Sequence, residues 1–548
     1  MGDGRLSEGA VRASDLAAPV PRAAWLPAAI SGVLLALAFP YPDLHALVWV
    51  ALVPVIVAAG GGGAWRRWSA GFVTGFLWRL GSLYWIAHVM INYAGMSAPV
   101  GAAVAGLLAA WLALSTGVVL LLAPIALRRG IGGAAVFAAA WVSLEYLQTI
   151  LPFGFPWSLL GYASGRSPLM MQAADLAGVW GLSFAAVFVN VAIAQRIVVG
   201  RRALSSAVAA AALVVAIAGY GAVRLAAAPV VGNAPSPAAA AVRVATVQGN
   251  VEQGRMWDPD ELGAILANHV DMSLEAIAAG ADLIMWPESS VPVRGGLEAD
   301  PSTRAMLAEL ARRHDTTLVV GSPHYETGPA GEWEVTNASF LVAADGEWTL
   351  RYDKVHLVPW GEYVPVSWLF RFVAPLVEAV GSFRRGAVDQ ELFADPDAGI
   401  PPFAMAICYE IVFPDHVRRQ VARGATFLVT ITNDAWFGAT SAPYQHFSMA
   451  QMRAVETRRY LVRVANTGIS GFVDPWGRVI ESTALNEPAL LLGEIWPSEE
   501  ITLYVAVGDV LPRFCVVLAL GGVVFYRRRS SVLSQPPTAR SVEDVRET

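Results

Sequence analysis

The sequence predicts a chain in two parts: a multi-pass α-helical membrane domain of about eight spans, and an α/β layered domain that lies outside the cytoplasm. The 548 residues are 55% apolar and only 15% charged, and their mean hydropathy is +0.49. These values exclude a purely soluble enzyme and a disordered chain. Long apolar runs fill residues 24–228, whereas short β-branched runs alternate with amphipathic stretches after residue 241. With a net charge of −6, the chain lacks the basic face that nucleic-acid binding requires.

The membrane domain is predicted from the length of the apolar runs. A helix needs roughly 20 apolar residues to cross about 30 Å of hydrocarbon, and seven runs reach or approach that length. They lie at about 24–40, 44–60, 69–91, 99–127, 133–150, 174–199 and 203–228. An eighth run, at 505–525, follows the α/β domain. Residues 1–23 and 526–548 are expected to be cytoplasmic tails, and the first of them lacks the pattern of a signal peptide.

The arginines of the connecting loops predict the orientation. A pair of arginines follows each of the second, fourth and sixth runs, and three arginines follow the eighth. The loops at 39–45 and 92–98 have neither Lys nor Arg, and the loop at 151–173 has only Arg166. Because cytoplasmic loops are enriched in Lys and Arg, both termini are expected in the cytoplasm and the α/β domain on the other side of the membrane.

A linker rich in Pro and Ala, at 229–241, separates the membrane domain from the α/β domain at 242–500. Strand-like and helix-like segments alternate in this second domain, which favours a layered α/β core. The predicted strands are 242–248, 282–286, 317–321, 404–408 and 426–432. The predicted helices are 259–279, with Asp258 as N-cap, and 302–314.

Two residue types are rare enough to be informative. The chain has only two cysteines, Cys408 and Cys515, too few for a disulfide framework. Cys515 falls in the last apolar run, where it is expected to be a small apolar filler. Cys408 is the one cysteine of a domain predicted to lie outside the cytoplasm, so a chemical role is favoured. Lys354 is the only lysine among the 38 Lys and Arg residues.

Three segments of the α/β domain carry reactive groups near predicted strands. Glu288 follows the strand at 282–286, Cys408 ends the strand at 404–408, and Lys354 lies between them in the chain. Side chains at strand ends project into the sites of α/β folds. A thiol at a strand-to-helix turn becomes nucleophilic when a carboxylate base and an ammonium group stand nearby.

Each of these residues also has an ordinary interpretation. A glutamate after a strand is most often a salt-bridge partner, an isolated cysteine is most often part of a core, and a single lysine can arise by chance. Their occurrence together in one domain favours a catalytic site. Arg79 and Glu145 lie within or near apolar runs, where charge is usually functional, but pairing with each other or reaching the interface is the simpler interpretation.

These segments resemble the apolipoprotein N-acyltransferase family, a membrane-embedded branch of the nitrilase (carbon–nitrogen hydrolase) superfamily with an αββα sandwich and a Glu-Lys-Cys triad. The resemblance covers about residues 24–525 and implies seven spans, an outward nitrilase-like domain and one closing span. Further matching strings are Val247-Gln248-Gly249-Asn250, Trp257-Asp258, Trp360-Gly361-Glu362-Tyr363-Val364-Pro365, Thr432-Asn433-Asp434-Ala435-Trp436-Phe437-Gly438, Tyr444-Gln445-His446, Ala465-Asn466-Thr467-Gly468-Ile469-Ser470, Phe153-Gly154-Phe155-Pro156-Trp157 and Gly161-Tyr162.

The resemblance implies a two-step acyl transfer through a thioester. Cys408 would attack an ester carbonyl of a membrane phospholipid, and a lysophospholipid would leave. The free α-amine of the diacylglyceryl-modified N-terminal cysteine of an apolipoprotein would then accept the acyl chain. Glu288 would act as the base, and Lys354 with the backbone N–H of Tyr409 would stabilise the tetrahedral oxyanion.

Three further residues are expected to support the triad or bind substrate: Glu362, Glu410 and Trp257. The two carboxylates would orient Lys354 and the neighbouring loop, although ordinary ion pairing is an equal alternative for them. The spacing of His356, His416 and His446 does not suggest a metal site, so neither a metal nor another cofactor is expected.

The implied partners are a phospholipid acyl donor, a diacylglyceryl-modified lipoprotein acceptor and the bilayer, with no nucleic acid. We expect a monomer in the bacterial cytoplasmic (inner) membrane, with its catalytic domain on the periplasmic side. An apolar arm at 364–383 is expected to dip into the outer leaflet or to line an acyl groove, and packing on the domain's own core is the alternative.

Two rival functions remain at this point. A membrane-tethered amidase or nitrilase would use the same triad on a small soluble substrate, with water as the acceptor. A transporter with an inactive outer domain would need charges along several spans, and only Arg79, Glu145 and His88 lie well inside the first seven runs. The choice of phospholipid, acyl chain and lipoprotein is not encoded in any motif that we find.

Overall fold

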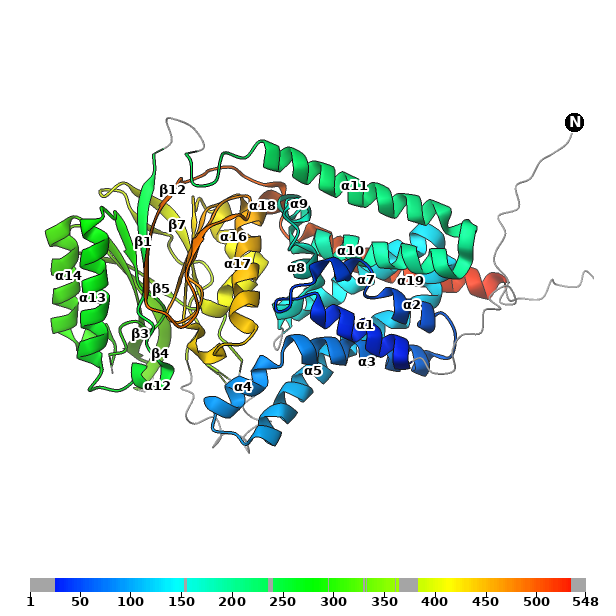
Figure 1. Cartoon of the computed structure of the whole chain (residues 1–548), viewed down its shortest axis with the longest axis horizontal. Helices are drawn as coiled ribbons and strands as arrows, with labels where there is room; N and C mark the ends of the chain where they lie inside the picture. Colours follow the sequence, from blue (N-terminus) through cyan, green and yellow to red (C-terminus); the bar gives the residue numbers. More distant parts are fainter. Residues whose placement is uncertain are drawn as a thin grey trace, which may run out of the picture.

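The computed structural model describes residues 25–533 apart from 152–154, 235–239, 294, 329–330, 332, 360 and 364–382. Within these residues the chain forms a helical part and an α/β part, which lie end to end along the long axis of the molecule (Figure 1). The predicted N-terminal tail, residues 534–548 of the predicted C-terminal tail, and all of the apolar arm except Phe383 lie outside the described residues.

The helical part is built from two stretches of the chain. Its N-terminal helices are followed by the whole α/β part, after which the chain returns to it with one long helix. The bounds are α1 (Trp25–Leu37), α2 (Val53–Ala59), α3 (Ala64–Ser82), α4 (Trp85–Asn92), α5 (Ala98–Leu120), α6 (Ala123–Arg128), α7 (Gly130–Ile150), α8 (Leu160–Ser164), α9 (Pro168–Met171), α10 (Ala174–Val199), α11 (Leu204–Ala226), α18 (Leu503–Val507) and α19 (Val510–Leu533).

The helices follow the predicted apolar runs with some differences. The third run, at 69–91, is divided between α3 and α4, because the helix ends at Ser82 and restarts at Trp85. The last helix continues to Leu533, so the chain is helical beyond residue 525, where the tail was predicted to begin. A kink interrupts α10 at Gly178, whose φ is +62° and whose backbone lies against the ring of Tyr504. Glycine is the residue that adopts this conformation without a steric cost.

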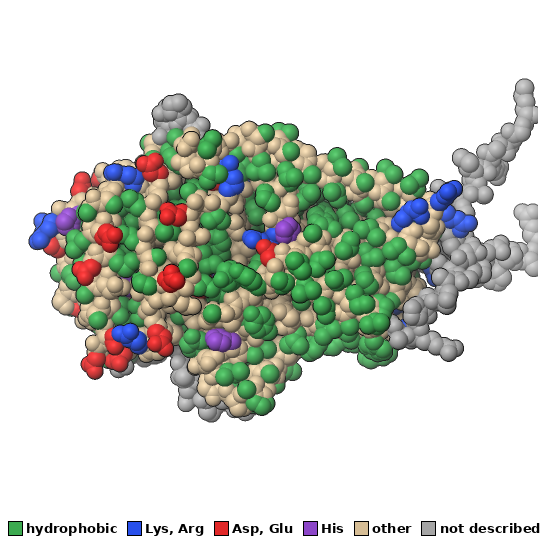
Figure 2. Space-filling view, in the orientation of Figure 1, with side chains coloured by type: hydrophobic (Ala, Val, Ile, Leu, Met, Phe, Trp, Pro, Cys, Tyr) green, Lys and Arg blue, Asp and Glu red, His purple; other side chains and the backbone are tan. Residues whose placement is uncertain are grey.

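The helical part has the surface of a membrane protein. Among the described residues, the helical stretches Ala98–Arg128, Gly130–Ile150 and Ala174–Ala226 are long and apolar enough to cross a membrane, and Trp25–Leu37, His45–Ala59 and Val510–Tyr526 are shorter apolar stretches. Figure 2 shows hydrophobic side chains covering this part, while Asp and Glu gather on the α/β part and arginines at the opposite end. The number of spans and their orientation stay predictions.

The α/β part contains two six-stranded sheets. The first has the order β12-β1-β2-β3-β4-β5 and the second the order β11-β10-β9-β8-β7-β6. The bounds are β1 (Val242–Gln248), β2 (Leu283–Met285), β3 (Thr317–Thr327), β4 (Trp333–Val342), β5 (Trp348–Asp353), β6 (Phe393–Asp395), β7 (Ile400–Ile407), β8 (Leu428–Thr432), β9 (Leu461–Ala465), β10 (Gly471–Val473), β11 (Val479–Ser482) and β12 (Ala489–Ile495).

Parallel strands form the centre of each sheet. The pairs β1–β2 and β2–β3 are parallel in the first sheet, and β7–β8 and β8–β9 are parallel in the second. The outer strands pair antiparallel. The carboxyl ends of central parallel strands are where α/β folds place their sites.

The two sheets pack face to face between helices. Apolar residues of both sheets, such as Met285, Val319, Met405 and Ile431, form the core between them. Helices α13 (Leu262–Ala278) and α14 (Pro301–His314) cover the outer face of the first sheet, and α16 (Pro414–Ala422) and α17 (Ala442–Thr457) lie between the second sheet and the helical part (Figure 1). The result is an αββα sandwich whose α16–α17 side shares a continuous apolar core with the helical part.

The predicted strands all occur, with ends shifted by up to six residues. One predicted helix start is wrong. The helix predicted to begin at Pro259 with Asp258 as N-cap begins at Leu262 instead. The Asp258 side chain accepts a hydrogen bond from the Asp260 amide at 3.0 Å, and this local turn competes with helix formation. Asp300 does cap α14, since its side chain accepts from the amides of Ser302 and Thr303.

Candidate active site

The three predicted reactive residues lie together at strand ends of the two sheets. Glu288 follows β2 and Lys354 follows β5, both in the first sheet. Cys408 follows β7 in the second sheet. All three side chains are buried, and both Glu288 and Lys354 act electrostatically on the Cys408 thiol. The fold therefore brings a carboxylate, an ammonium group and a thiol from three distant segments to one place.

Lys354 is held between two carboxylates. Its Nζ lies 3.1 Å from Oε1 of Glu288 and 2.8 Å from Oε1 of Glu362, and its side chain is only 1% exposed. Burial disfavours the charged amine, but Glu288 and Glu362 outweigh burial and hold the pKa of Lys354 well above its ordinary value. The lysine is therefore an ammonium ion at neutral pH, and Glu362 is one of its two direct partners. This contact fits both the orienting role and the ordinary ion pair that the sequence analysis named for Glu362.

The carboxylate of Glu288 is fixed by two asparagines that the sequence analysis did not single out as site residues. Asn337, on β4, donates its Nδ2 to Oε1 of Glu288 at 2.6 Å and to Oε1 of Glu362 at 2.9 Å. The backbone amide of Asn433, after β8, donates to Oε2 of Glu288 at 2.8 Å. Asn433 lies in one of the strings that resemble the family, whereas no pattern in the sequence pointed to Asn337.

Cys408 occupies a strained turn. It is the first residue after β7 and has a φ of +53°, a left-handed conformation that non-glycine residues adopt at a cost of about 1–3 kcal/mol. Burial, and then the negative charge of Glu288, raise the pKa of the Cys408 thiol well above its ordinary value, while Lys354 lowers it in part. The raised pKa favours the neutral thiol, and a neutral thiol needs a base if it is to act as a nucleophile.

Glu410 joins the turn at Cys408 to the loop that follows Lys354. Its Oε1 accepts from the amides of Val355 and His356 at 2.5 and 3.0 Å. Its Oε2 accepts from the Ile407 amide at 2.7 Å and from the Tyr352 hydroxyl at 2.9 Å. The carboxylate thus joins the residues that follow Lys354 to the residue that precedes Cys408. The loop-orienting role expected for Glu410 stays a prediction.

Tyr409, whose backbone N–H was expected to stabilise the oxyanion, packs against the helical part. Its ring stacks on Phe155 and Trp157 with centroid separations of 6.0 and 6.3 Å. Both of those residues come from the segment between α7 and α8. The nucleophile turn is therefore in contact with the helical part through aromatic side chains.

A second buried network lies on the other side of Cys408. His446, on α17, hydrogen-bonds the Cys408 carbonyl oxygen through Nε2 at 3.1 Å, and since a carbonyl can only accept, Nε2 carries the hydrogen. Asp434 lies 3.1 Å from Nδ1 of His446 and 2.8 Å from Arg463. Burial and Arg463 lower the pKa of His446. The network was not predicted, although His446 lies in a matching string.

Trp257 is the one predicted site residue that lies apart from the triad. It follows the short helix α12 (Gln253–Met256) and is 39% exposed. Its neighbour Met256 contacts the side chain of Asn433 at 3.3 Å. Trp257 is therefore partly exposed and lies one residue from a chain of contacts that leads through Asn433 to Glu288.

Within the described ranges of the chain, no group of three or more His, Cys, Asp or Glu side chains has an arrangement that could hold a metal ion. The acidic and basic groups at the site are instead engaged with each other and with backbone amides.

Comparison with protein families covers both parts of the chain. Residues 243–501 match the model of the carbon–nitrogen hydrolases, and residues 31–192 match the model of the apolipoprotein N-acyltransferase N-terminal domain. Solved structures of an amidase from Nesterenkonia sp. AN1 also align with the chain, for example at 22% identity over 49% of this chain and 94% of the amidase, with a TM-score of 0.36.

Curated relatives align over nearly the whole chain. The apolipoprotein N-acyltransferase of Geobacter metallireducens is 39% identical over 93% of this chain and 97% of its own length. The enzyme of the same name from Azotobacter vinelandii is 36% identical over 86% of this chain and 88% of its own length. Since the similarity extends across the helical and the α/β parts alike, the chain belongs to the apolipoprotein N-acyltransferase family.

Proposed function

We propose that this protein transfers a fatty acyl chain from a membrane phospholipid, through a thioester on Cys408, to the α-amino group of the diacylglyceryl-modified N-terminal cysteine of apolipoproteins. The observation that carries the proposal is the Cys408 thiol, which lies within electrostatic reach of Glu288 and Lys354 in a domain that packs against apolar helices. Homologues named apolipoprotein N-acyltransferase support it.

In the first half-reaction, Glu288 takes the proton of the Cys408 thiol as the sulfur attacks the ester carbonyl carbon of the phospholipid. The carbonyl oxygen becomes an oxyanion, which the Lys354 ammonium and the backbone N–H of Tyr409 stabilise. When the tetrahedral intermediate collapses, the C–O bond breaks and Glu288 returns its proton to the leaving lysophospholipid oxygen. An acyl-enzyme thioester remains.

In the second half-reaction, the lipoprotein amine attacks the thioester carbonyl and gives a proton to Glu288. The C–S bond breaks, Glu288 returns a proton to the Cys408 sulfur, and an amide is formed. Glu362 and Asn337 hold Glu288 and Lys354 in place during both steps. We assign Glu362 and Glu410 to positioning, and Trp257 to binding substrate.

The hydrolase alternative explains less of the chain. An amidase for small soluble substrates would use the same triad, but it would leave the apolar helices without a function. The helical part matches the N-terminal domain of apolipoprotein N-acyltransferases over residues 31–192, and this match supports a lipid substrate.

Family membership and the apolar helices indicate a protein of the inner membrane. We further propose that eight spans cross it, that both termini are cytoplasmic and that the α/β part faces the periplasm. Arginines at the end of the helical part remote from the α/β part (Figure 2) support this orientation. Oligomer formation is not part of the proposal, and we expect the monomer to be active.

Intact mass spectrometry after incubation with one diacyl phospholipid, without acceptor, tests the proposed function. We expect a mass increase of one acyl chain that neutral hydroxylamine removes and that a diacylated lipopeptide discharges. The matched control is the other cysteine: the adduct should persist in Cys515→Ala and be absent in Cys408→Ala. An unmodified wild-type protein and no released lysophospholipid would refute the lipid-donor mechanism.

A further inference from the structure

Two buried charged residues of the helical part hold the same short piece of backbone. Arg79, on α3, is 1% exposed and Glu145, on α7, is 3% exposed. Arg79 Nη1 donates to the carbonyl oxygen of Ser158 at 2.6 Å. Oε1 of Glu145 accepts from the backbone amide of Leu160 at 2.7 Å. One charge thus binds an acceptor and the other a donor on the segment 155–160.

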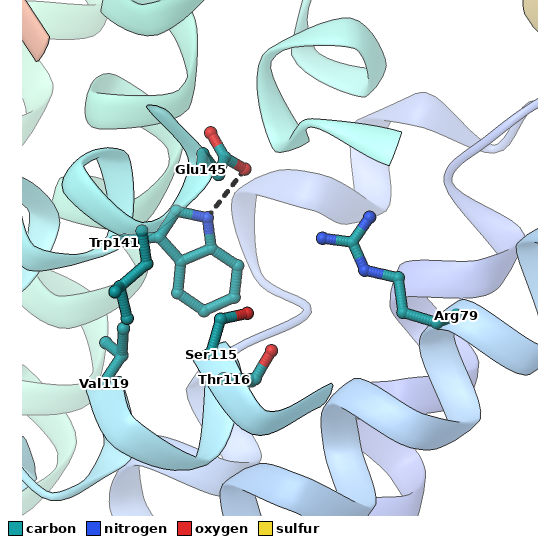
Figure 3. Close-up of a pocket in the computed structure, with 7 residues that line it drawn as sticks. Arg79, Ser115, Thr116, Val119, Trp141 and Glu145 are labelled. Carbon is teal, nitrogen blue, oxygen red and sulfur yellow. Dashed lines mark hydrogen bonds between the residues drawn. The ribbon is translucent and has the colours of Figure 1, made fainter. Parts of the chain in front are cut away.

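The two charges face each other across a small cavity and are not joined directly. The cavity is lined on its polar side by Arg79, Ser115, Thr116 and Glu145 (Figure 3), and the ion pairs of the described residues do not include one between Arg79 and Glu145. The guanidinium also lies 3.8 Å from the centroid of the Trp78 ring. Since isolated charges in apolar surroundings are costly, each of the two helps to keep the other in place.

The segment that they hold leads to the nucleophile. Phe155 and Trp157 stack on Tyr409, the residue after Cys408. The Trp157 ring also lies 5.3 Å from the ring of His446, which donates to the Cys408 carbonyl. A displacement of segment 155–160 would therefore shift Tyr409 and His446, the two residues that contact the segment and adjoin Cys408.

We propose that Arg79 and Glu145 are positioning residues for acyl transfer: from inside the helical part they fix segment 155–160, and through it the Cys408–Tyr409 turn that presents the thiol and the oxyanion N–H. This inference rests on the proposed role of Cys408. It assigns the two charges to the geometry of the reaction and not to a path for ions or protons.

The test compares the rate of acyl-enzyme formation in full-length variants, with mixed micelles of one diacyl phospholipid as the donor. In Arg79→Leu and Glu145→Leu we expect the maximal rate to fall about 100-fold, as for a misplacement of about 1 Å. The lipid concentration for half-maximal rate should stay unchanged. The conservative variants Arg79→Lys and Glu145→Gln keep a donor and an acceptor, so they should recover to within about tenfold of wild type.

Gln195→Leu is the matched control, because Gln195 is equally buried in the helical part but holds the carbonyl of Gly130 at 2.8 Å, away from segment 155–160. It should lower the melting temperature and leave the maximal rate unchanged. A wild-type rate in Arg79→Leu, or an equal loss of rate in Gln195→Leu, would overturn the proposal.

Two further measurements keep the test decisive. If the leucine variants do not fold, Trp157→Leu removes the ring that links the segment to Tyr409 without removing a buried charge, and a wild-type rate in that variant would count against the proposal. Alkylation of Cys408 by iodoacetamide in a Cys515→Ala background reports on the same turn without lipid. A wild-type protein that is alkylated but never acylated refutes the proposed function, while unchanged alkylation in Arg79→Leu refutes this inference.

Discussion

Among the buried opposite charges of the described residues, two sets are built in different ways, and each belongs to a different part of the molecule. In the α/β part, Lys354 contacts Glu288 and Glu362 directly, at 3.1 and 2.8 Å. In the helical part, Arg79 and Glu145 stand apart and each bonds a backbone group of segment 155–160. The direct pair lies at the reacting thiol, whereas the separated pair acts on chain geometry.

The difference shows how the surroundings determine the use of a buried charge. A charged group beside a reacting atom must stay in place while the charge of its neighbour changes during the reaction. Lys354 and Glu288 each have more than one partner, so each stays held when one of these interactions changes. A charge that binds a peptide group is engaged with a fixed dipole and is best suited to hold the backbone.

Exchanging the type of cation should affect the two pairs unequally. Lys354→Arg is expected to lower the rate of acyl-enzyme formation at least about 10³-fold, because a planar guanidinium differs in shape from the ammonium that faces the oxyanion. Arg79→Lys should cost about tenfold at most, since an ammonium group still donates to the Ser158 carbonyl. Acylation rates measured by intact mass spectrometry decide the matter. If the two variants lost acylation rate to a similar extent, the two sets of buried charges would not differ in their use.

Removing the Lys354 ammonium group should also reveal the free-energy cost of burying Glu288 and Glu362 without a cation. Lys354→Met leaves Glu288 and Glu362 buried without their ammonium partner, so the free energy of unfolding should fall by about 3–5 kcal/mol. Differential scanning calorimetry of the wild type and the variant measures this loss of stability. Arg243, which pairs with Asp282 at the exposed surface, provides the control, because its substitution by Met should change stability by less than about 1 kcal/mol. A Lys354→Met protein as stable as wild type would contradict the ion-pair geometry.

Glu410 shows that the α/β part also contains a carboxylate that holds backbone. Glu410→Ala leaves three backbone amides without their acceptor and removes one of the two hydrogen-bond partners of the Tyr352 hydroxyl, and we expect a loss of at least about 3 kcal/mol in stability. Glu410→Gln keeps one acceptor oxygen and should lose less. Thermal unfolding of both variants is the measurement, with exposed Glu494→Ala as the control. Equal stability of Glu410→Ala and Glu494→Ala would show that Glu410 does not hold the backbone in place.

The pH dependence of thiol reactivity tests how the direct pair is used. Because the pKa of Cys408 is raised by burial and by Glu288, the thiol stays protonated above its ordinary pKa of about 8.5. The rate of iodoacetamide labelling in a Cys515→Ala background should therefore keep rising up to about pH 9. A plateau below about pH 7 would instead indicate a preformed thiolate that Lys354 stabilises.

The raised pKa of Cys408 also predicts how the stability of the protein changes with pH. A group whose pKa is raised in the folded protein contributes stability that is complete below its unfolded pKa and is lost as the pH rises above it. The stability difference between wild type and Cys408→Ala should therefore move against wild type above about pH 8.5. Melting curves of both proteins across this range measure the change, and a difference that is independent of pH would contradict the burial of the thiol.

The smallest effect on activity and stability is expected for substitution of Trp257, which is partly exposed. Trp257→Ala should change the free energy of unfolding by about 0.5 kcal/mol or less, because the side chain is 39% exposed. If the indole binds substrate, the lipid or lipopeptide concentration for half-maximal rate should rise about fivefold, while iodoacetamide labelling of Cys408 stays unchanged. Unaltered kinetics with both substrates would show that Trp257 has no role in binding.

Much of the candidate site was predictable because its residues are chemically unusual in this chain. Lys354 is the only lysine, Cys408 is one of two cysteines, and both occur beside recognisable strands. Asn337 carries no such signal: it lies in the middle of β4, and only the pairing of β4 in the sheet brings its amide to Glu288 and Glu362. A polar residue inside a strand is usually an exposed or locally bonded side chain, so its role cannot be read from the sequence.

The sequence by itself determined the division into an apolar helical part and an α/β part and the main strands, and it singled out Glu288, Lys354 and Cys408 as candidate reactive residues, because hydrophobic periodicity and rare residue types are local properties. The tertiary structure alone decided which groups meet. The contacts of Glu288 with Asn433, of Cys408 with His446, and of segment 155–160 with Arg79 and Glu145 join residues that lie 15 to 145 positions apart in the chain, and no local pattern encodes them. Burial then set the charge states, since the raised pKa of Cys408 follows from its enclosure and its neighbours and not from the residue type.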